Sequence, residues 1–164
     1  MGLLARQLHA ALDAAGSTLA VAESLTGGRL AVTLAEAPGA SSVFKGLVTA
    51  YATDVKAQVL HVPPDLLDRK GLSTARSRNR WPRRADPHVR HLRARHHRRR
   101  GPRPQDGHPP GTVHIAVAGP HGTASVELGV HGDREVVQHA AVIGAHQLLH
   151  GHLRPTDSPI GETR

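Results

Sequence analysis

The stretch TLAVAESLTGGRLAVTLA, residues 18–35, decides how this chain begins to fold. Residues 18–22 form a short apolar run, which predicts a buried strand. Gly27 and Gly28 then lead into a helical pattern of apolar residues through position 35, and Pro38 and Gly39 end that pattern. The stretch therefore predicts a strand, a tight polar turn and a helix, with Ser24 at the C-terminal end of the strand.

The N-terminal half continues the same pattern on both sides of this stretch. Apolar residues recur at helical spacing from position 3 to 12 and are followed by Gly16, so we expect a helix over 3–15. Residues 43–51 are apolar enough for a second strand, after which Thr53 or Asp54 can cap a helix through residue 60. One or two more helical turns are expected over 64–71.

The C-terminal half predicts a hairpin and a long helix. Residues 112–118 and 123–130 are rich in strand formers and are joined by glycines and a proline. Asp133 is then expected to cap a helix that runs to Leu149, and residues 154–164 are expected to form a loose tail. Strands that alternate with helices at both ends predict an α/β fold with a mixed sheet, in one domain over 1–153.

The excess of positive charge in the chain comes from one segment. The formal net charge is +8, but residues 76–103 hold twelve arginines and one acidic residue, so the rest of the chain is acidic. A continuous run of like charges is typical of solvated segments. The few apolar residues in this segment cannot bury enough surface to offset the conformational entropy that folding would cost. We therefore expect no core element over 76–103, and treat 72–103 as irregular or disordered.

Several classes of protein are excluded by composition. Without cysteine the chain can form no disulfide, thiolate nucleophile or cysteine-based zinc site. It has neither a long apolar run nor a signal peptide, so we expect a cytoplasmic protein that does not associate with a membrane. His146 and His150 are spaced four apart on a helix, but no acidic ligand completes a zinc-enzyme pattern, and we predict no metal site.

The turn after the first strand has the residue types of a reactive site. A serine beside a Gly-Gly helix start has backbone N–H groups near its hydroxyl, which suits a phosphate or a developing oxyanion. On residue types alone, capping of the helix by Ser24 or Thr26 is the simpler interpretation. Likewise, Tyr51 and Lys56 alone would be read as a half-buried strand residue and a solvated helix residue, and Arg134 either faces water or binds a phosphate.

Five motifs in order resemble the CinA C-terminal domain family of nicotinamide-nucleotide amidohydrolases. Ala22-Glu23-Ser24-Leu25-Thr26-Gly27-Gly28 is similar to the family's Ala-Glu-Ser-Cys-Thr-Gly-Gly signature, with Leu25 as the departure. The other four matching segments are 38–44 (Pro-Gly-Ala-Ser-Ser-Val-Phe), 51–56 (Tyr-Ala-Thr-Asp-Val-Lys), 110–113 (Pro-Gly-Thr-Val) and 132–134 (Gly-Asp-Arg).

The resemblance implies a fold, an activity and a site. The fold would be a three-layer α/β/α sandwich, and the reaction would convert nicotinamide mononucleotide to nicotinate mononucleotide and ammonia without a cofactor or metal. Ser24 would attack the carboxamide carbon, and Lys56 and Tyr51 would transfer the protons. Thr26, Gly27, Gly28, Phe44 and Arg134 would contact the nucleotide. The family also implies a homodimer.

Two alternatives to an active amidohydrolase remain open from the sequence. The chain could be a catalytically inactive relative that has lost its substrate loop. A third class is a nonspecific polyanion or nucleic-acid binder that uses the arginine block, but that block has one aromatic residue and no stacking pattern. We therefore expect no specific nucleic-acid partner.

The arginine block has a specific interpretation. The family's Thr-Thr-Gly-Val-Ala-Gly-Pro loop, which precedes the Gly-Thr-Val strand, is absent here. If a high-GC gene wrote it as ACC ACC GGC GTC GCG GGC CCA GA after a C, reading one nucleotide early decodes as His-His-Arg-Arg-Arg-Gly-Pro-Arg, which is residues 96–103. The same offset converts residues 75–78 into Pro-Glu-Val-Ala, a family-like helix. We interpret 72–103 as the product of two compensating frameshifts.

We predict that the gene, read one nucleotide later from the codon near Leu72 to that near Arg103, encodes a glycine-rich loop. The two ends of the segment share one offset, so a single change of frame restores both. Sequencing the gene checks this. A plus-one frame that encodes no Thr-Thr-Gly-Val-Ala-Gly-Pro-like loop rules the interpretation out.

Overall fold

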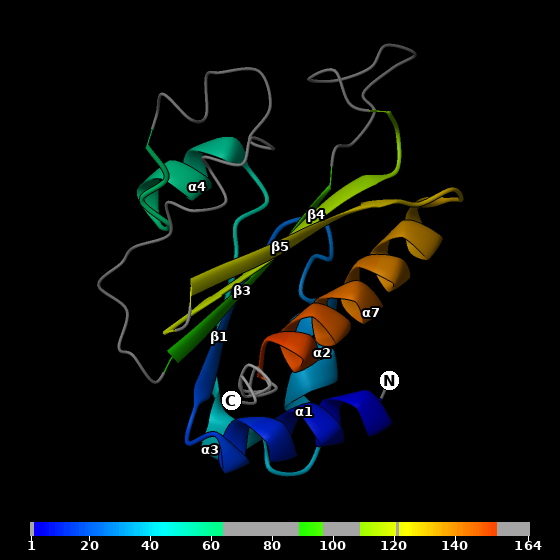
Figure 1. The fold of residues 1–164 in the computed structure, drawn as a ribbon. Coiled ribbons are helices and arrows are strands. Elements are labelled where there is room, and N and C mark those ends of the chain that lie inside the picture. Colours follow the sequence, from blue (N-terminus) through cyan, green and yellow to red (C-terminus); the bar gives the residue numbers. More distant parts are fainter. Residues whose placement is uncertain (1, 64–88, 97–108, 121, 154–164) are drawn as a thin grey trace, which may run out of the picture.

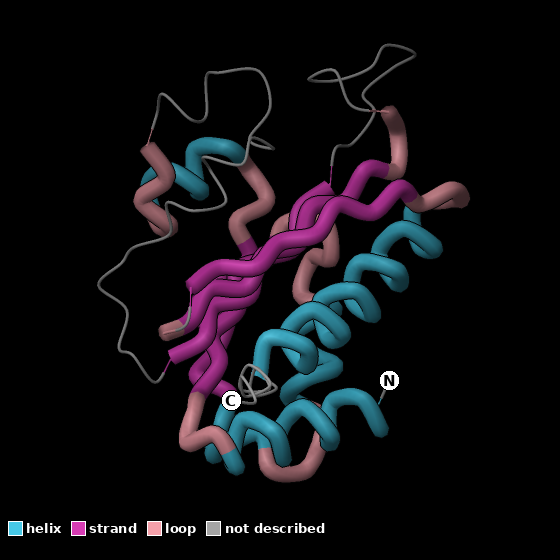
Figure 2. The backbone as a smooth tube through the Cα atoms, in the orientation of Figure 1, coloured by secondary structure: helices cyan, strands magenta, loops and turns pink. Residues whose placement is uncertain are grey.

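The computed structural model describes residues 2–63, 89–96, 109–120 and 122–153, and its strands form one mixed sheet (Figure 1; Figure 2). The strand order is β2-β1-β3-β4-β5. β1 runs parallel to both β2 and β3, whereas β4 is antiparallel to β3 and β5. The strands are β1 (Thr18–Glu23), β2 (Phe44–Thr49), β3 (Val89–His96), β4 (Thr112–Gly119) and β5 (Gly122–Gly129).

Helices lie on both faces of this sheet. α1 (Gly2–Ala14), α2 (Arg29–Ala35) and α7 (Arg134–Leu153) cover one face, and α3 (Ala40–Val43) lies beside α1 (Figure 1). α4 (Thr53–Gln58) lies on the opposite face. The predicted α/β class with a mixed sheet is therefore confirmed, and α4 supplies the third layer among the described residues.

The hydrophobic core fills the space between the sheet and the three-helix face. Val113, Ile115 and Val117 alternate along β4 and are fully buried there. α7 approaches this surface closely at Gly144, where an added Cβ would lie 2.9 Å from Ile115 Cδ1. The helices and β1 contribute the remaining large apolar side chains that are fully buried, which are Leu8, Leu12, Leu19, Leu30, Leu34, Val43 and Leu149.

Most elements predicted from periodicity are present, with small shifts at their ends. The first helix, the strand before Ser24, the hairpin and the long final helix are confirmed. The predicted strand over 43–51 is shorter, because a turn of helix occupies Ala40–Val43. Neither Thr53 nor Asp54 caps α4, whose N-cap is Ala52 without a side-chain bond. The helical turns expected over 64–71 and the tail over 154–164 lie outside the described residues.

The expectation of no core element over 76–103 is wrong at β3. Residues Val89–His96 form an interior strand that pairs with β1 on one side and β4 on the other. Composition misled the prediction because a strand between two existing strands is held by backbone hydrogen bonds, and tertiary pairing overrides local preference. The rest of the arginine block lies outside the described residues.

Two histidines are buried within the helical layer. His9 on α1 is 3.3 Å from the carbonyl of Pro38 through Nδ1, and His146 on α7 is 3.3 Å from the Thr33 hydroxyl through Nε2. His146 is only 2% exposed, and its Nδ1 has no hydrogen-bond partner among the described residues. Burial, together with the nearby His9, lowers the pKa of His146 from 6.5 to about 4.

We predict that His146 makes the fold sensitive to acid. The pKa of His146 is lower in the folded chain than in the unfolded chain, so between about pH 6.5 and pH 4 only the unfolded chain binds a proton at this residue. The free energy of unfolding therefore decreases as the pH drops through this range. The loss from this residue at pH 4.5 is about 2–3 kcal/mol. Urea unfolding at pH 7 and pH 4.5 measures it. His146→Gln is expected to reduce the pH dependence, whereas His139→Gln, at an exposed position of the same helix, is not. Equal pH dependence in all three proteins would contradict the assignment.

Candidate active site

Ser24 lies where the connections of the sheet diverge. It follows directly after β1, whose last residue Glu23 is level with Thr49 of β2. The chain leaves β1 through α2 on one face and leaves β2 through α4 on the other (Figure 1). Because β1 lies between its two parallel neighbours, its C-terminal end is a topological switch point, where open α/β sheets bind their ligands.

The turn that carries Ser24 is closed by its own backbone. The Gly27 N–H donates to the Ser24 carbonyl at 3.3 Å, and the Arg29 N–H donates to the Thr26 carbonyl at 3.1 Å. Gly28 has a φ of 102°, which favours glycine over any other residue. Ser24 is itself partly exposed at this turn, whereas its neighbours Glu23 and Leu25 are buried.

Glu23 organises the turn from beneath. Its side chain is 2% exposed, and one carboxylate oxygen accepts hydrogen bonds from the Thr26 hydroxyl and, at 3.3 Å, from the Leu30 N–H. The N-cap of α2, Gly28, has no side chain to cap the helix, so the carboxylate satisfies a first-turn N–H instead. The Glu23 carbonyl also accepts the Ala50 N–H at 2.9 Å, which fixes the residue before Tyr51.

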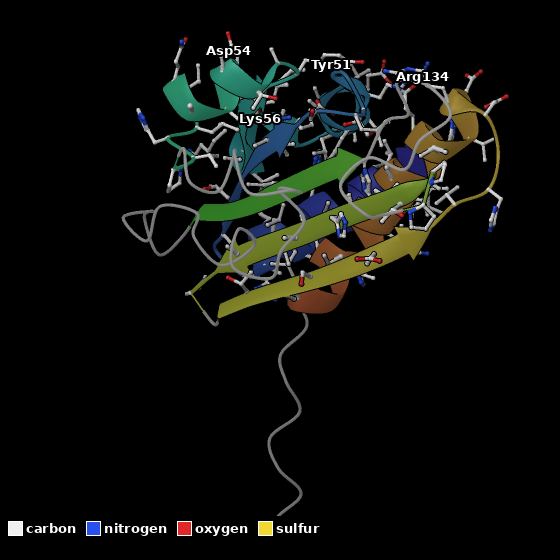
Figure 3. The ribbon with its side chains drawn as sticks, turned by 90° about the horizontal axis from the view of Figure 1, so that it is seen from above. Tyr51, Asp54, Lys56 and Arg134 are labelled. Atoms are coloured by element: carbon white, nitrogen blue, oxygen red, sulfur yellow. The ribbon has the colours of Figure 1, made fainter. Side chains whose placement is uncertain are left out.

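Tyr51 and Arg134 meet at this edge although they are far apart in the sequence. The Arg134 guanidinium donates a hydrogen bond to the Tyr51 hydroxyl at 3.0 Å (Figure 3). The Asp133 carboxylate caps α7 by accepting the N–H groups of Glu135 and Val136, as predicted for Asp133. The cap fixes the start of α7 and thereby places Arg134 beside the tyrosine.

Lys56 is buried on α4, whereas Phe44 lies at the end of β2 that is far from Ser24. Lys56, on α4, is 6% exposed, so it is not the solvated helix residue that its type alone suggested. Phe44 begins β2, pairs with Leu19 and packs against the core. It is five strand residues from Thr49, or about 16 Å. The structure therefore does not bring Phe44 to the edge that holds Ser24, in contrast to the expectation from its motif.

The remaining turn residues face in another direction. The Thr26 side chain is 1% exposed and is bonded to Glu23, so only its backbone is available to a substrate. Gly27 and Gly28 line a cavity of about 280 Å³ between α2 and α7, to which Ser24, Tyr51 and Lys56 do not contribute. Its other lining residues are Arg29, Val32, Thr33, His139 and Val142.

A model of the CinA C-terminal domain matches residues 2–80 and 100–153, which include Ser24, Tyr51, Lys56 and Arg134. The chain belongs to the CinA C-terminal domain family. The match leaves out residues 81–99, which fall within the segment of atypical composition. Within the described residues, no group of His, Asp or Glu is arranged to hold a metal ion, and no helix is long and apolar enough to cross a membrane.

Relatives of known sequence and structure agree with this family. A CinA-like protein of Frankia casuarinae is 39% identical over 141 residues, which cover 81% of this chain and 31% of that protein. A CinA-like protein of an Anaeromyxobacter species is 41% identical over 159 residues, covering 88% and 36%. The chain thus spans about a third of the length of these curated relatives.

Solved CinA superfamily structures cover nearly the whole chain. The protein from Escherichia coli aligns with a TM-score of 0.80 at 25% identity and covers 90% of this chain and 87% of its own. The competence/damage inducible protein from Agrobacterium tumefaciens aligns with a TM-score of 0.78 at 25% identity, covering 93% and 94%. The shared fold therefore extends over most of this chain and most of each solved chain.

Two residues that hold the site were not identified from the sequence. Glu23 lies inside the quoted motif, and an acidic residue that ends an apolar strand was a signal of a buried carboxylate. Gln138 donates a hydrogen bond to the Leu25 carbonyl at 2.7 Å and is 7% exposed. Its signal is weaker, because a glutamine in a helix usually faces solvent.

We predict that Glu23→Ala destabilises the fold by about 2–4 kcal/mol, because it removes two hydrogen bonds to a buried carboxylate and leaves a cavity. Glu23→Gln retains an acceptor and should cost about 1–2 kcal/mol. Urea unfolding measures both, with Glu36→Gln at an exposed position as the control. A Glu23→Ala protein as stable as the control would show that the carboxylate does not hold the turn.

Proposed function

We propose that this domain hydrolyses the carboxamide of nicotinamide mononucleotide to a carboxylate and ammonia, as the resemblance implies. The observation that carries the proposal is the location of Ser24, Tyr51 and Arg134 at one edge of the sheet, the switch point after β1. These residues come from motifs at both ends of the chain, yet Tyr51 is hydrogen bonded to Arg134 and follows the residue bonded to Glu23.

The chemistry begins with a serine that must be activated. Ser24 Oγ attacks the carboxamide carbon while its proton passes to a base, for which Lys56 and Tyr51 are the candidates, since a serine hydroxyl is a weak nucleophile alone. The carbonyl oxygen becomes an oxyanion, which backbone N–H groups of the turn can stabilise. Collapse of this intermediate breaks the C–N bond, and the leaving nitrogen takes a proton and departs as ammonia.

The second half of the reaction restores the enzyme. Water attacks the acyl ester on Ser24, and its proton passes to the same base. The ester C–O bond breaks, Ser24 regains its proton, and the product leaves as a carboxylate. Hydrolysis thus consumes one water and releases one ammonia per carboxamide, with no change of oxidation state and no cofactor required.

Arg134 and Tyr51 supply the recognition in this proposal. A nucleotide phosphate is an anion, and an exposed guanidinium at the rim of the site can bind it through two parallel hydrogen bonds. The bond from Arg134 to Tyr51 orients the guanidinium beforehand, which lowers the entropy lost on binding. The tyrosine would therefore link recognition of the phosphate to proton transfer at Ser24.

We predict that Ser24→Ala abolishes ammonia release from nicotinamide mononucleotide, with a loss of at least about 1,000-fold in kcat. A coupled ammonia assay measures it on this chain and on the protein with its plus-one frame restored over 72–103. Ser41→Ala, at an exposed position, serves as the matched control and should retain activity. Undiminished release by Ser24→Ala refutes the assignment, and no release by either parent protein favours a catalytically inactive relative.

A further inference from the structure

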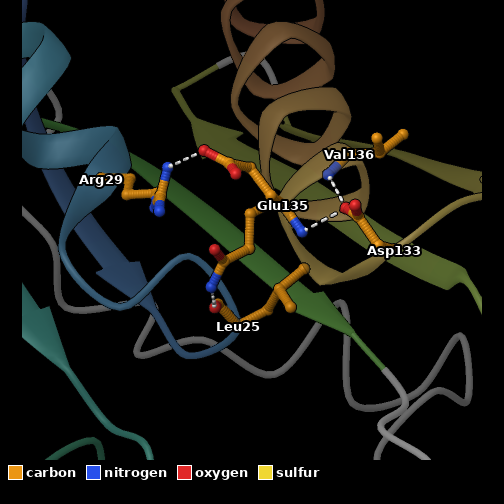
Figure 4. Close-up of polar contacts among 6 residues, drawn as sticks. Leu25, Arg29, Asp133, Glu135 and Val136 are labelled. Carbon is orange, nitrogen blue, oxygen red and sulfur yellow. Dashed lines mark hydrogen bonds and ion pairs between the residues drawn. The ribbon is translucent and has the colours of Figure 1, made fainter.

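The start of α7 contacts the turn after β1 and the loop after β2 through three polar side chains. Arg134 donates to Tyr51, Glu135 lies 3.7 Å from Arg29, and the Gln138 amide donates to the Leu25 carbonyl at 2.7 Å. The contacts to the turn that carries Ser24 are drawn in Figure 4. A single helix end thus touches both segments that supply the proposed chemistry.

Of these contacts only the one made by Gln138 is buried. The Arg29 and Glu135 side chains are 49% and 74% exposed, and solvent screens an ion pair of this kind. Gln138 lies in the buried stripe of α7, next to Val137 and Ala141. Burying the Gln138 amide without a hydrogen-bond partner would cost free energy. Only the NH2 group of this amide can donate to the Leu25 carbonyl, so the hydrogen bond determines which way the amide is turned.

The Leu25 carbonyl belongs to the same peptide unit as the Thr26 N–H. In a trans peptide these two groups point in opposite directions, so a bond that holds the carbonyl toward α7 turns the N–H away from α7. α4, which carries Lys56, lies on that opposite side of the sheet (Figure 1). Among the described residues, no backbone carbonyl accepts a hydrogen bond from the Thr26 N–H.

We infer that Gln138 is a positioning residue, which holds the Leu25–Thr26 peptide so that the Thr26 N–H is directed toward the oxyanion formed at Ser24. The inference rests on Ser24 being the nucleophile of the proposed function, but not on the identity of the substrate. Gln138 itself touches no substrate. Its loss should slow attack by Ser24 while leaving substrate binding, which depends on Arg134, nearly unchanged.

A serine-directed probe tests this without relying on nicotinamide mononucleotide. In a fluorophosphonate, Ser24 Oγ attacks phosphorus, fluoride leaves, and the serine proton is released, so the P–O⁻ character that develops resembles the oxyanion. We expect Gln138→Met, which keeps the length but removes the donor, to slow labelling of Ser24 by roughly 10- to 100-fold. Gln147→Met, at an exposed position of the same helix, should label at the parent rate.

A second measurement reports on the peptide directly. Carbonyl carbon shifts in NMR are sensitive to hydrogen bonding, so Gln138→Met should move the Leu25 carbonyl and Thr26 amide signals, whereas Gln147→Met should not. With nicotinamide mononucleotide, kcat should fall and KM should change by less than about threefold.

The outcomes separate the inference from the proposed function. Slower labelling with shifted Leu25 and Thr26 signals supports the inference even if the parent protein releases no ammonia. In that case labelling shows that Ser24 is reactive, which counts against an inactive relative and overturns only the proposed substrate. Unchanged labelling of a folded Gln138→Met protein overturns the inference, as does a parent protein whose Ser24 does not react. If Gln138→Met does not fold, Gln138→Leu gives the same comparison, and unmoved Leu25 and Thr26 signals in either variant also overturn it.

Discussion

The Glu23 carboxylate is the constraint on which this site depends. A carboxyl group that is 2% exposed is costly to bury without hydrogen bonds, and one of its oxygens accepts them from the Thr26 hydroxyl and the Leu30 N–H. The carboxylate thereby joins the end of β1 to the first turn of α2 and forces the residues between them into a tight turn. Its own carbonyl holds Ala50, so the positions of Ser24 and Tyr51 both derive from one residue. The burial of the Glu23 side chain and the position of Ser24 therefore depend on the same contacts.

α7 stabilises the fold and completes the site with different parts of its surface. Its middle and C-terminal turns bury Ala141, Ala145 and Leu149 against the core, and this apolar burial supplies most of its packing energy. Its first turns carry Arg134, Glu135 and Gln138, which contact the segments after β1 and β2. Because the Asp133 cap and the apolar core fix the helix axis, the polar side chains at its start have little freedom to move. A rigid helix is a better support for a site than a loop.

The sequence predicted elements where a single periodicity dominates and failed where pairing is nonlocal. The apolar run before Ser24 and the two glycines after it identified β1, the turn and α2, and the motif order identified the family. β3 was missed, since its residues gain their place from backbone bonds to β1 and β4 that no local pattern records. Thr26 and Phe44 were grouped with the substrate by motif, but the side chain of Thr26 bonds Glu23 and Phe44 begins β2 at its other end. The role of Gln138 could not be predicted, because its partner Leu25 is 113 residues away in the sequence.

The position of β3 explains how a chain with so atypical a middle can still hold its site. The family match covers residues on both sides of 81–99, and the two matched parts meet in two ways. In the sheet, β1 reaches β4 only across β3. In the helical layer, α7 packs directly on α1 and α2 through apolar side chains such as Leu8, Leu30 and Leu149. The contacts of Leu25 and Arg29 with α7 belong to this second route. The helical layer thus connects the two matched parts directly, without the strand between them.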